Sequence, residues 1–290
     1  MARNAAAGTA FGPMVLSAVE HQEPPARRLV DDDLAAAFLP LPLRAFVRAT
    51  RWAPLRRAVV RLSDRSGPGL WTNLACRKRY IDDNLGDALT DIDAVVVLGA
   101  GLDTRAYRLA RHSDLPVFEV DQPVNIDRKK KVLARVFGSP PASVHLVPVD
   151  FERDDLMATL ASHGYDAGVR TFFVWEGVTQ YLTESAVRAT FDQLASAAVG
   201  SRLDFTYVRE DFIDGANKYG AEVLYRQTRG KKRLWKFGLP PDDVGDFLAG
   251  YGWRLIEQAG PDEFVDRYVR PAGRDLTASQ IEWSAYAEKI

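Results

Sequence analysis

The stretch Ala94–Arg105, AVVVLGAGLDTR, joins a short β-branched run to a glycine-rich turn and the start of a helix. Residues 94–98 are too few for a helix and are apolar on both faces, which is typical of a central parallel strand. Gly99 and Gly101 let the backbone of the turn approach a ligand closely, and a helix that begins there offers unpaired amides. This stretch therefore predicts a strand, a turn and a helix arranged around a ligand.

Apolar runs of similar length follow this strand and alternate with helical patterns. We expect strands at Pro116–Val120, Val144–Val149, Thr171–Trp175 and Arg202–Val208, with helices over 104–112, 124–137, 154–163 and 184–198. This alternation indicates a parallel sheet with right-handed crossovers and helices on both faces. Two final strands are expected at Trp253–Gln258 and Ile281–Lys289, and the imperfect alternation of the second suits an edge or a hairpin. The fold class is therefore α/β, Rossmann-like, with a mostly parallel sheet.

The segments on either side of the alternating region complete the domain organisation. Residues 1–90 are expected to form a helical cap, because apolar residues recur there at spacings of three and four. Four glycines lie among charged and aromatic residues in 210–241, which predicts an insertion after the fifth strand. The core of residues 91–290 and the cap are expected to form one structural domain.

Composition excludes several functional classes. The 290 residues are 47% hydrophobic and 27% charged with a net charge of −1, so bulk charge recruits neither nucleic acid nor a membrane. The stretch between Arg27 and Arg79 is basic, which suits an anionic substrate or, as we favour, the solvated side of amphipathic helices. The single cysteine, Cys76, excludes an intramolecular disulfide, and four scattered histidines lack metal-ligand spacing, so no metal site is expected.

Localisation is predicted from the apolar runs. None reaches the roughly 18 residues that a membrane-spanning helix requires. The start of the chain, residues 1–19, is apolar but is interrupted by Gly8, Gly12 and Pro13, so a secretion signal is not expected. We therefore expect a cytoplasmic protein.

The glycine turn and an acidic residue on the next strand predict a nucleoside cofactor. Asp121 closes the second strand, where a carboxylate can accept both ribose hydroxyls. A dinucleotide fingerprint would need glycine where Thr104 stands, and Asp103 places negative charge where a pyrophosphate would lie. The sulfonium and ammonium groups of S-adenosylmethionine instead favour nearby acids. These residues favour S-adenosylmethionine over NAD.

Two further strand ends carry candidate ligand-binding residues. Asp150 can accept from the exocyclic amine of adenine while Phe151 covers a ring face. Alternatively, Asp150 caps the following helix and Phe151 belongs to the core. Glu176 follows the fourth strand, and ligands of doubly wound folds lie outside the carboxyl ends of the strands. Glu176 is therefore expected near the methionine part of the cofactor or the transferring methyl group, and Thr183 is expected to cap the next helix.

These motifs together resemble a known family. The strings VVVLGAGLDTRAYRL, FEVDQP, VPVDFERDDL, TFFVWEGVTQYLT and IEWSAYAEK are similar to those of the leucine carboxyl methyltransferase-like family. Within it they resemble the actinobacterial branch of S-adenosylmethionine-dependent enzymes, which includes polyketide carboxyl O-methyltransferases. The resemblance extends upstream to SAVEHQEPPARRLVDDDLA and ACRKRYIDDNL and covers almost the whole chain. The pairing of GAGLDTR with EVDQP is more specific than a lone glycine motif.

The resemblance implies a role for each matching residue. Asp121 matches the ribose-binding aspartate, Asp150 and Phe151 match the adenine-side pair, and Arg77 matches a helical arginine that forms a salt bridge with the donor's carboxylate. The expected S-adenosyl-L-methionine site comprises Arg77, Gly99, Ala100, Gly101, Asp121, Gln122, Asp150, Phe151 and Glu176.

The expected activity is O-methylation, with a small-molecule carboxylic acid as the preferred acceptor. A carboxylate is ionised at pH 7 and needs no base, whereas a phenol or an alcohol needs one. No histidine lies in the strand-end motifs, which favours the carboxylate; Glu176 and Tyr181 are the catalytic candidates for a hydroxyl acceptor. Tyr207, Tyr219, Tyr225 and Trp235 can line an aromatic pocket or belong to the core.

Two alternative functions stay open at the level of the sequence. An NAD(P)-dependent oxidoreductase on the same fold and a non-catalytic nucleoside-binding protein are the alternative functions. The insertion at 210–241 is shorter than in many relatives, which leaves the acceptor undefined. The oligomeric state is likewise open.

Overall fold

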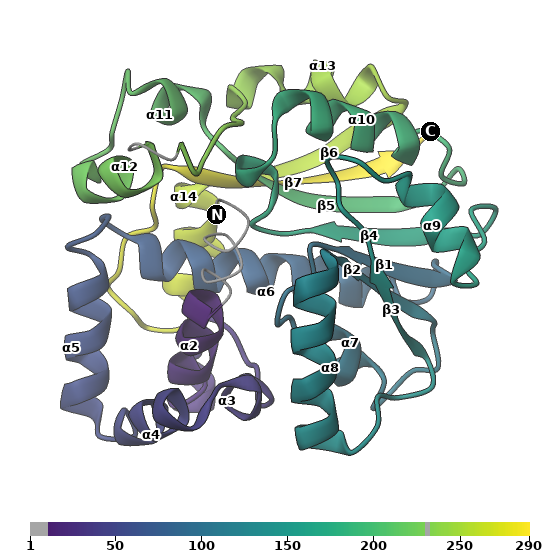
Figure 1. Ribbon diagram of the computed structural model, residues 1–290. Coiled ribbons are helices and arrows are strands. Elements are labelled where there is room, and N and C mark those ends of the chain that lie inside the picture. The colour runs from purple at the N-terminus through teal and green to yellow at the C-terminus, as the bar shows by residue number, and fades with distance from the viewer. Residues whose placement is uncertain (1–10, 230–232) are drawn as a thin grey trace.

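The computed structural model describes residues 11–229 and 233–290, and its centre is one seven-stranded sheet (Figure 1). The strands are β1 (Ala94–Leu98), β2 (Val117–Asp121), β3 (Val144–Pro148), β4 (Thr171–Trp175), β5 (Arg202–Val208), β6 (Trp253–Ala259) and β7 (Glu282–Lys289). Their order across the sheet is β3-β2-β1-β4-β5-β7-β6. The first five strands are parallel, and β7 is antiparallel to both of its neighbours.

The helices fall into three groups along the chain. Before β1 lie α2 (Phe11–Glu20), α3 (Ala35–Phe38), α4 (Leu41–Ala49), α5 (Ala53–Ser63) and α6 (Leu70–Ala88). Between the parallel strands lie α7 (Arg105–Leu109), α8 (Pro123–Phe137), α9 (Leu156–Ser162) and α10 (Glu184–Leu194). After β5 follow α11 (Glu210–Asp214), α12 (Glu222–Arg229), α13 (Val244–Ala249) and α14 (Pro261–Phe264). Single turns of other helix types are η1 (Pro25–Arg27), η2 (Thr179–Tyr181), η3 (Pro241–Asp243) and η4 (Val265–Val269).

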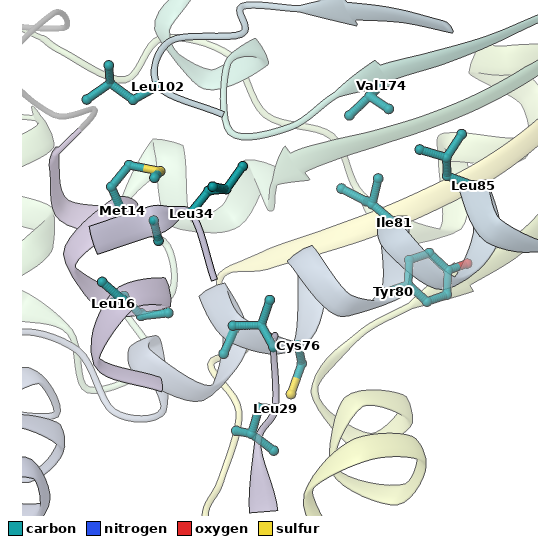
Figure 2. Packing of buried hydrophobic residues seen from close by; sticks show 14 of the residues in the cluster. Met14, Leu16, Leu29, Leu34, Cys76, Tyr80, Ile81, Leu85, Leu102 and Val174 are labelled. Atoms are coloured by element: carbon teal, nitrogen blue, oxygen red, sulfur yellow. The ribbon is translucent and has the colours of Figure 1, made fainter. Parts of the chain in front are cut away.

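Both faces of the sheet are covered by helices, as the apolar runs predict. Val95 and Val97 of β1 belong to a hydrophobic cluster shared with α2, α3 and α6, whereas Val96 packs with α9, α10 and α13 on the opposite face. Figure 2 shows Ile81 and Leu85 of α6 pointing toward β4 in the first cluster. Burial on both faces explains why β1 and β4 are almost wholly apolar, whereas the buried strand β2 also contains Glu119 and ends at Asp121.

The predicted strands are all present, with bounds that differ by at most one residue. Of the two alternatives for 281–289, the edge was wrong; the strand instead pairs antiparallel with the strand that precedes it in the sequence, as in a hairpin. The last strand, β7, lies between β5 and β6, and β6 is the edge. Its alternation is imperfect because both of its faces are covered: Ala285 and Ala287 pack on one side and Tyr286 packs on the other.

Some helices are absent from the sequence prediction. Gly12 and Pro13 interrupt the apolar start of the chain, yet both lie in the first turn of α2, where proline needs no hydrogen-bonded amide. The insertion contains two short helices, α11 and α12, where only irregular structure was expected.

Residues 1–10, on which the predicted absence of a secretion signal partly rests, lie outside the described residues. Over the described ranges, no helix combines the length and the apolar character that crossing a bilayer requires.

Candidate functional site

A cavity of about 320 Å³ opens beyond the carboxyl ends of β1 and β4, where the strand order reverses. In open α/β sheets this switch point is where ligands bind, and the volume is at the lower end of those of small-molecule sites. Of the residues that the sequence predicts, the cavity wall contains Arg77, Gly99, Ala100, Gly101, Asp121, Gln122, Phe151, Glu176 and Tyr181. Sequence segments 100 residues apart therefore meet in one place.

The glycine turn and Asp121 are held together by short hydrogen bonds. The amide of Gly101 donates to Oδ2 of Asp121 at 2.6 Å, and the amide of Gln122 donates to Oδ1 at 2.6 Å. The side chain of Asn125 adds a third donor to Oδ1 at 2.8 Å. Asp121 is 7% exposed and lines the cavity, so its carboxylate is preoriented at the point where β2 ends.

Gly99 is required by its backbone and by its neighbour. Its φ is +72°, and a Cβ at this position would lie 2.3 Å from the side chain of Val178. The turn is anchored to the sheet because the amides of Gly99 and Ala100 both donate to the carbonyl of Val120, at 2.7 and 2.9 Å. The close approach of the turn to the segment after β4 closes the floor of the cavity.

Thr104, the residue that departs from a dinucleotide fingerprint, has a structural partner. It is fully buried, and its hydroxyl donates to Oδ2 of Asp32 at 2.7 Å. Asp32 in turn accepts the amide of Ala35 at 2.9 Å at the start of α3. The threonine thus joins the N-terminal helices to the start of α7.

Glu176 lies at the centre of a buried charge cluster. Its Oε1 accepts from Nε of Arg77 at 3.0 Å, and its Oε2 accepts from Nη1 of Arg105 at 2.6 Å. Arg77 also donates to Glu282 of β7, and Arg105 donates to Asp103. The cluster connects α6, β7, the glycine turn and the end of β4.

The positive charges of the cluster lower the pKa values of two of its carboxyl groups. Burial alone would raise the pKa of Glu176, but the positive charges of Arg105, Lys78 and Arg77 lower it below its usual range. Burial likewise opposes ionisation of Asp103, and Arg105 and Lys78 outweigh it, so the pKa of Asp103 is also lowered. Glu176 is therefore a good partner for a cation and a weak general base.

Lys78 is a cavity residue that the sequence analysis missed. It is 4% exposed, and its Nζ lies 3.8 Å from Oδ2 of Asp103, beyond hydrogen-bond distance. The described parts of the chain provide no hydrogen-bond partner for this ammonium group. The available signal was its position directly after Arg77, but the basic stretch around it was interpreted as a solvated helix face.

The insertion contributes one wall of the cavity through Leu224 and Trp235. The ring of Trp235 meets that of Tyr181 edge to face, with centroids 6.4 Å apart. The amide of Lys236 donates to the carbonyl of Gln180 at 2.7 Å, which ties the insertion to η2. Tyr181 therefore lies between the end of β4 and the insertion.

Three of the four aromatic residues proposed for a pocket lie elsewhere. Tyr207 is fully buried and its hydroxyl donates to Gln258, so it belongs to the core. The hydroxyl of Tyr219 donates to Asp211, and Tyr225 packs on Phe212. Only Trp235 reaches the cavity.

Asp150 and Phe151 separate in the structure. Phe151 lines the cavity and stacks on Trp175 with a centroid distance of 6.2 Å, so it belongs to both the wall and the core. Asp150 is not among the wall residues; it accepts the amide of Glu152 at 3.3 Å. The alternative that Asp150 caps the next helix was wrong, because Asp155 caps α9 by accepting the amide of Ala158 at 2.9 Å. Thr183 caps α10 as predicted.

The chain is similar in sequence to proteins of a known family. The model of a family described as leucine carboxyl methyltransferase matches residues 10–195. A Mycobacterium tuberculosis protein, which its name assigns to the S-adenosyl-L-methionine-dependent methyltransferases, is 33% identical over 226 residues. The match covers 74% of this chain and 64% of that relative, so the chain spans less than two thirds of the relative's length. A Mycolicibacterium smegmatis protein with the same assignment is 34% identical over 70% of this chain and 68% of its own length.

Two solved structures share the fold. A DUF574 family protein from Streptomyces avermitilis has a TM-score of 0.57 at 14% identity, covering 82% of this chain and 91% of its own. A protein from Thermobifida fusca, assigned by its title to the methyltransferases, has a TM-score of 0.57 at 16% identity, covering 81% and 88%. At these identities the likeness concerns the fold alone.

Proposed function

The chain belongs to the leucine carboxyl methyltransferase family, and from that premise we propose that it is an S-adenosylmethionine-dependent O-methyltransferase acting on a carboxylate of a small molecule. The observation that carries the proposal is the buried Asp121 carboxylate, bound to the amide of Gly101, in one cavity with Glu176 and Lys78.

The residues present fit S-adenosylmethionine by their chemistry. Asp121 accepts from the ribose hydroxyls, and the adjacent Asn125 has a buried Oδ1 without a partner in the described residues, which suits a further donor. Phe151 offers a ring face to adenine. Glu176 accepts from the donor's ammonium group, while Lys78 and Arg77 donate to its carboxylate. The ammonium and the carboxylate of the cofactor's amino-acid part thus each have a partner of opposite charge.

The preference for a carboxylate acceptor over a hydroxyl acceptor follows from the lowered pKa of Glu176. Methylating a phenol or an alcohol requires a base, and arginine partners lower the pKa of this carboxyl group. None of the described residues lining the cavity is a histidine. A carboxylate acceptor needs no deprotonation at neutral pH, so the cavity suits it better than a hydroxyl.

The reaction moves no proton when the acceptor is a carboxylate. The acceptor oxygen forms the new C–O bond, and the electron pair of the broken C–S bond stays on sulfur. Bound S-adenosylmethionine supplies the electrophilic methyl carbon. The chain's own contribution is to hold the acceptor in line and to exclude water. Leu70, Leu74 and Trp235 form an apolar part of the wall that serves this second role.

The cofactor proposal is tested by calorimetric titration with S-adenosylhomocysteine, NAD and NADP in parallel. We expect micromolar binding of S-adenosylhomocysteine alone. Binding of a dinucleotide would instead favour an oxidoreductase, and binding of neither would contradict the proposed cofactor.

The acceptor proposal is tested with matched pairs that differ only in the accepting group. Decanoate is compared with decanol, and 1-naphthoate with 1-naphthol, using S-adenosylmethionine labelled in its methyl group. Carboxyl methyl esters release methanol in mild alkali, whereas methyl ethers are stable. We expect alkali-labile label on the acids; label that appears only on the alcohols would overturn the carboxylate assignment.

A further inference from the structure

A surface outside the cavity combines exposed apolar side chains with arginines. Leu41, Trp52 and Leu62 are 76%, 67% and 57% exposed. With Phe46, they make four of the nine large apolar side chains that are exposed in the described residues. All four lie in residues 41–62, on α4, α5 and the turn between them. Single exposed apolar residues are ordinary, but such a concentration marks an interaction surface.

The same segment is strongly basic. Arg48, Arg57, Arg61 and Arg65 are exposed, and no acidic group in the described ranges forms an ion pair with them. The one acidic residue between 41 and 65 is Asp64, which accepts the amide of Gly69 at 3.2 Å. Arg57, Arg61 and Arg65 are spaced four apart, so they form a row along the outer side of the helix and the turn that follows it.

The apolar inner sides of α4 and α5 pack against the rest of the protein. Their outer sides, which carry the exposed apolar and arginine side chains, face solvent. Val47 of α4 is 2% exposed and Val60 of α5 is 7% exposed. The two helices lie at one corner of the molecule, away from the sheet (Figure 1). We name the eight side chains on their outer side the α4–α5 surface: Leu41, Phe46, Trp52, Leu62, Arg48, Arg57, Arg61 and Arg65.

We propose that the α4–α5 surface binds an anionic phospholipid bilayer. Unpaired arginines attract anionic headgroups, leucine and phenylalanine side chains enter the acyl boundary, and tryptophan is favoured at headgroup level. A nucleic acid would bind the arginines but would leave Leu41 and Leu62 in water. A second copy of the chain would bring two rows of arginines together, which is unfavourable.

The surface adjoins the cavity along the chain. The chain continues from α5 into α6, where Leu70 and Leu74 line the cavity wall. A bilayer bound to the α4–α5 surface is therefore in contact with the segment that leads directly into one wall of the cavity. The proposal does not depend on the methyl-transfer activity, and the net charge of −1 does not oppose it, because membrane binding responds to local charge.

Vesicle sedimentation tests the electrostatic part. The 290-residue chain is mixed with vesicles of phosphatidylglycerol and phosphatidylcholine in equal parts, or of phosphatidylcholine alone. We expect binding to the anionic vesicles that weakens as salt rises. Each arginine near an anionic surface contributes about 1 kcal/mol, or about fivefold in affinity. The double variant Arg57→Gln/Arg61→Gln should therefore bind about 25-fold more weakly. The matched control Lys130→Gln/Lys131→Gln changes exposed charges on α8 and should bind as the unmodified protein does.

Tryptophan fluorescence tests the apolar part. Trp52 is exposed and Trp283 is partly exposed, whereas the other four tryptophans are buried, so Trp52 contributes the largest share of acrylamide quenching in the free protein. Anionic vesicles should protect it from quenching, and Trp52→Ala should remove the protected component. Leu62→Ser should weaken vesicle binding, whereas Val199→Ser, at a site 72% exposed on another part of the molecule, should not.

Three results would overturn the proposal: no sedimentation with anionic vesicles, an equal loss of binding in the α8 control, or a dimer that protects Trp52 without vesicles.

Discussion

Arg77 on α6 and Glu176 after β4 are 99 residues apart in sequence, and Nε of the arginine donates to Oε1 of the glutamate at 3.0 Å. Gly177 makes this contact possible. Its φ is +67°, and a Cβ there would lie 2.8 Å from Nη2 of Arg77. The glycine of the WEGV string therefore leaves room for the arginine that holds the preceding acid.

Replacing Gly177 with alanine should lower both stability and cofactor affinity. The left-handed backbone alone costs alanine about 1–2 kcal/mol, and the methyl group displaces Arg77. Urea unfolding measures the first effect and titration with S-adenosylhomocysteine measures the second. The control is Gly86→Ala on α6, where an added Cβ meets no atom within 4 Å; it should stabilise the protein by about 0.5–1 kcal/mol. A Gly177→Ala variant as stable as the original would contradict this account.

Asp121→Asn should weaken S-adenosylhomocysteine binding by at least tenfold, because a hydrogen bond to a charged group contributes about 1.5–3 kcal/mol. Calorimetry gives the affinity. Asp127→Asn, at an exposed position on α8, is the matched control and should leave the affinity unchanged. Unchanged affinity in a folded Asp121→Asn protein would remove this residue from the site.

Lys78→Met tests the cation for which the described residues supply no hydrogen bond. S-adenosylhomocysteine carries a carboxylate, whereas 5′-methylthioadenosine has the same nucleoside without the amino-acid part. If Lys78 binds the donor's carboxylate, the variant should lose about tenfold in affinity for the former and none for the latter. Equal losses for both ligands would indicate a general distortion of the cavity. Lys131→Met, on the exposed side of α8, is the control.

The buried Asp204 on β5 should make the free energy of unfolding depend on pH. Its side chain is fully buried, Oδ1 has no partner among the described residues, and Nδ2 of Asn84 donates to Oδ2 at 2.8 Å. Burial raises the pKa of this carboxyl group well above its ordinary 3.8, against the donation from Asn84. The unfolded chain therefore loses this proton at a lower pH than the folded protein does. Asp204 thus lowers stability as pH rises above about 4.

Asp204→Asn should remove this pH dependence. The variant should match the original protein near pH 4 and exceed it in stability at pH 8, by about 1.4 kcal/mol for each unit of raised pKa. Thermal unfolding at both pH values measures the difference. A variant that loses stability equally at the two pH values would show that the carboxyl group serves packing or hydrogen bonding alone.

The strand positions were predictable because burial on both faces leaves a local signature. Five-residue apolar runs such as 94–98 and 171–175 need no knowledge of their neighbours to be recognised. The glycine turn, Asp121 and Glu176 were predictable for the same reason, since each follows such a run directly. The division of the chain near residue 90 stays a prediction.

Other features depend on contacts that no local pattern contains. The place of β7 between β5 and β6 is decided by pairing over long separations, as with Thr206 opposite Ser284. Lys78 and Arg79 are consecutive basic residues of one helix, but only Lys78 is buried and faces the cavity. Asp150 follows its strand as Asp121 does, yet it turns to Glu152 rather than into the cavity.

The sequence by itself determined which segments become strands, where the glycine turn lies and which acids follow it, because hydrophobic periodicity and backbone sterics act over a few residues. The tertiary structure alone decided the partners of those acids and the lowered pKa of Glu176. Whether Glu176 is a base or an ionised anchor depends on Arg77 and Arg105, which come from other helices. The strength of electrostatic interactions in a buried site depends on distances in space and on the exclusion of water. A local sequence pattern specifies neither of these.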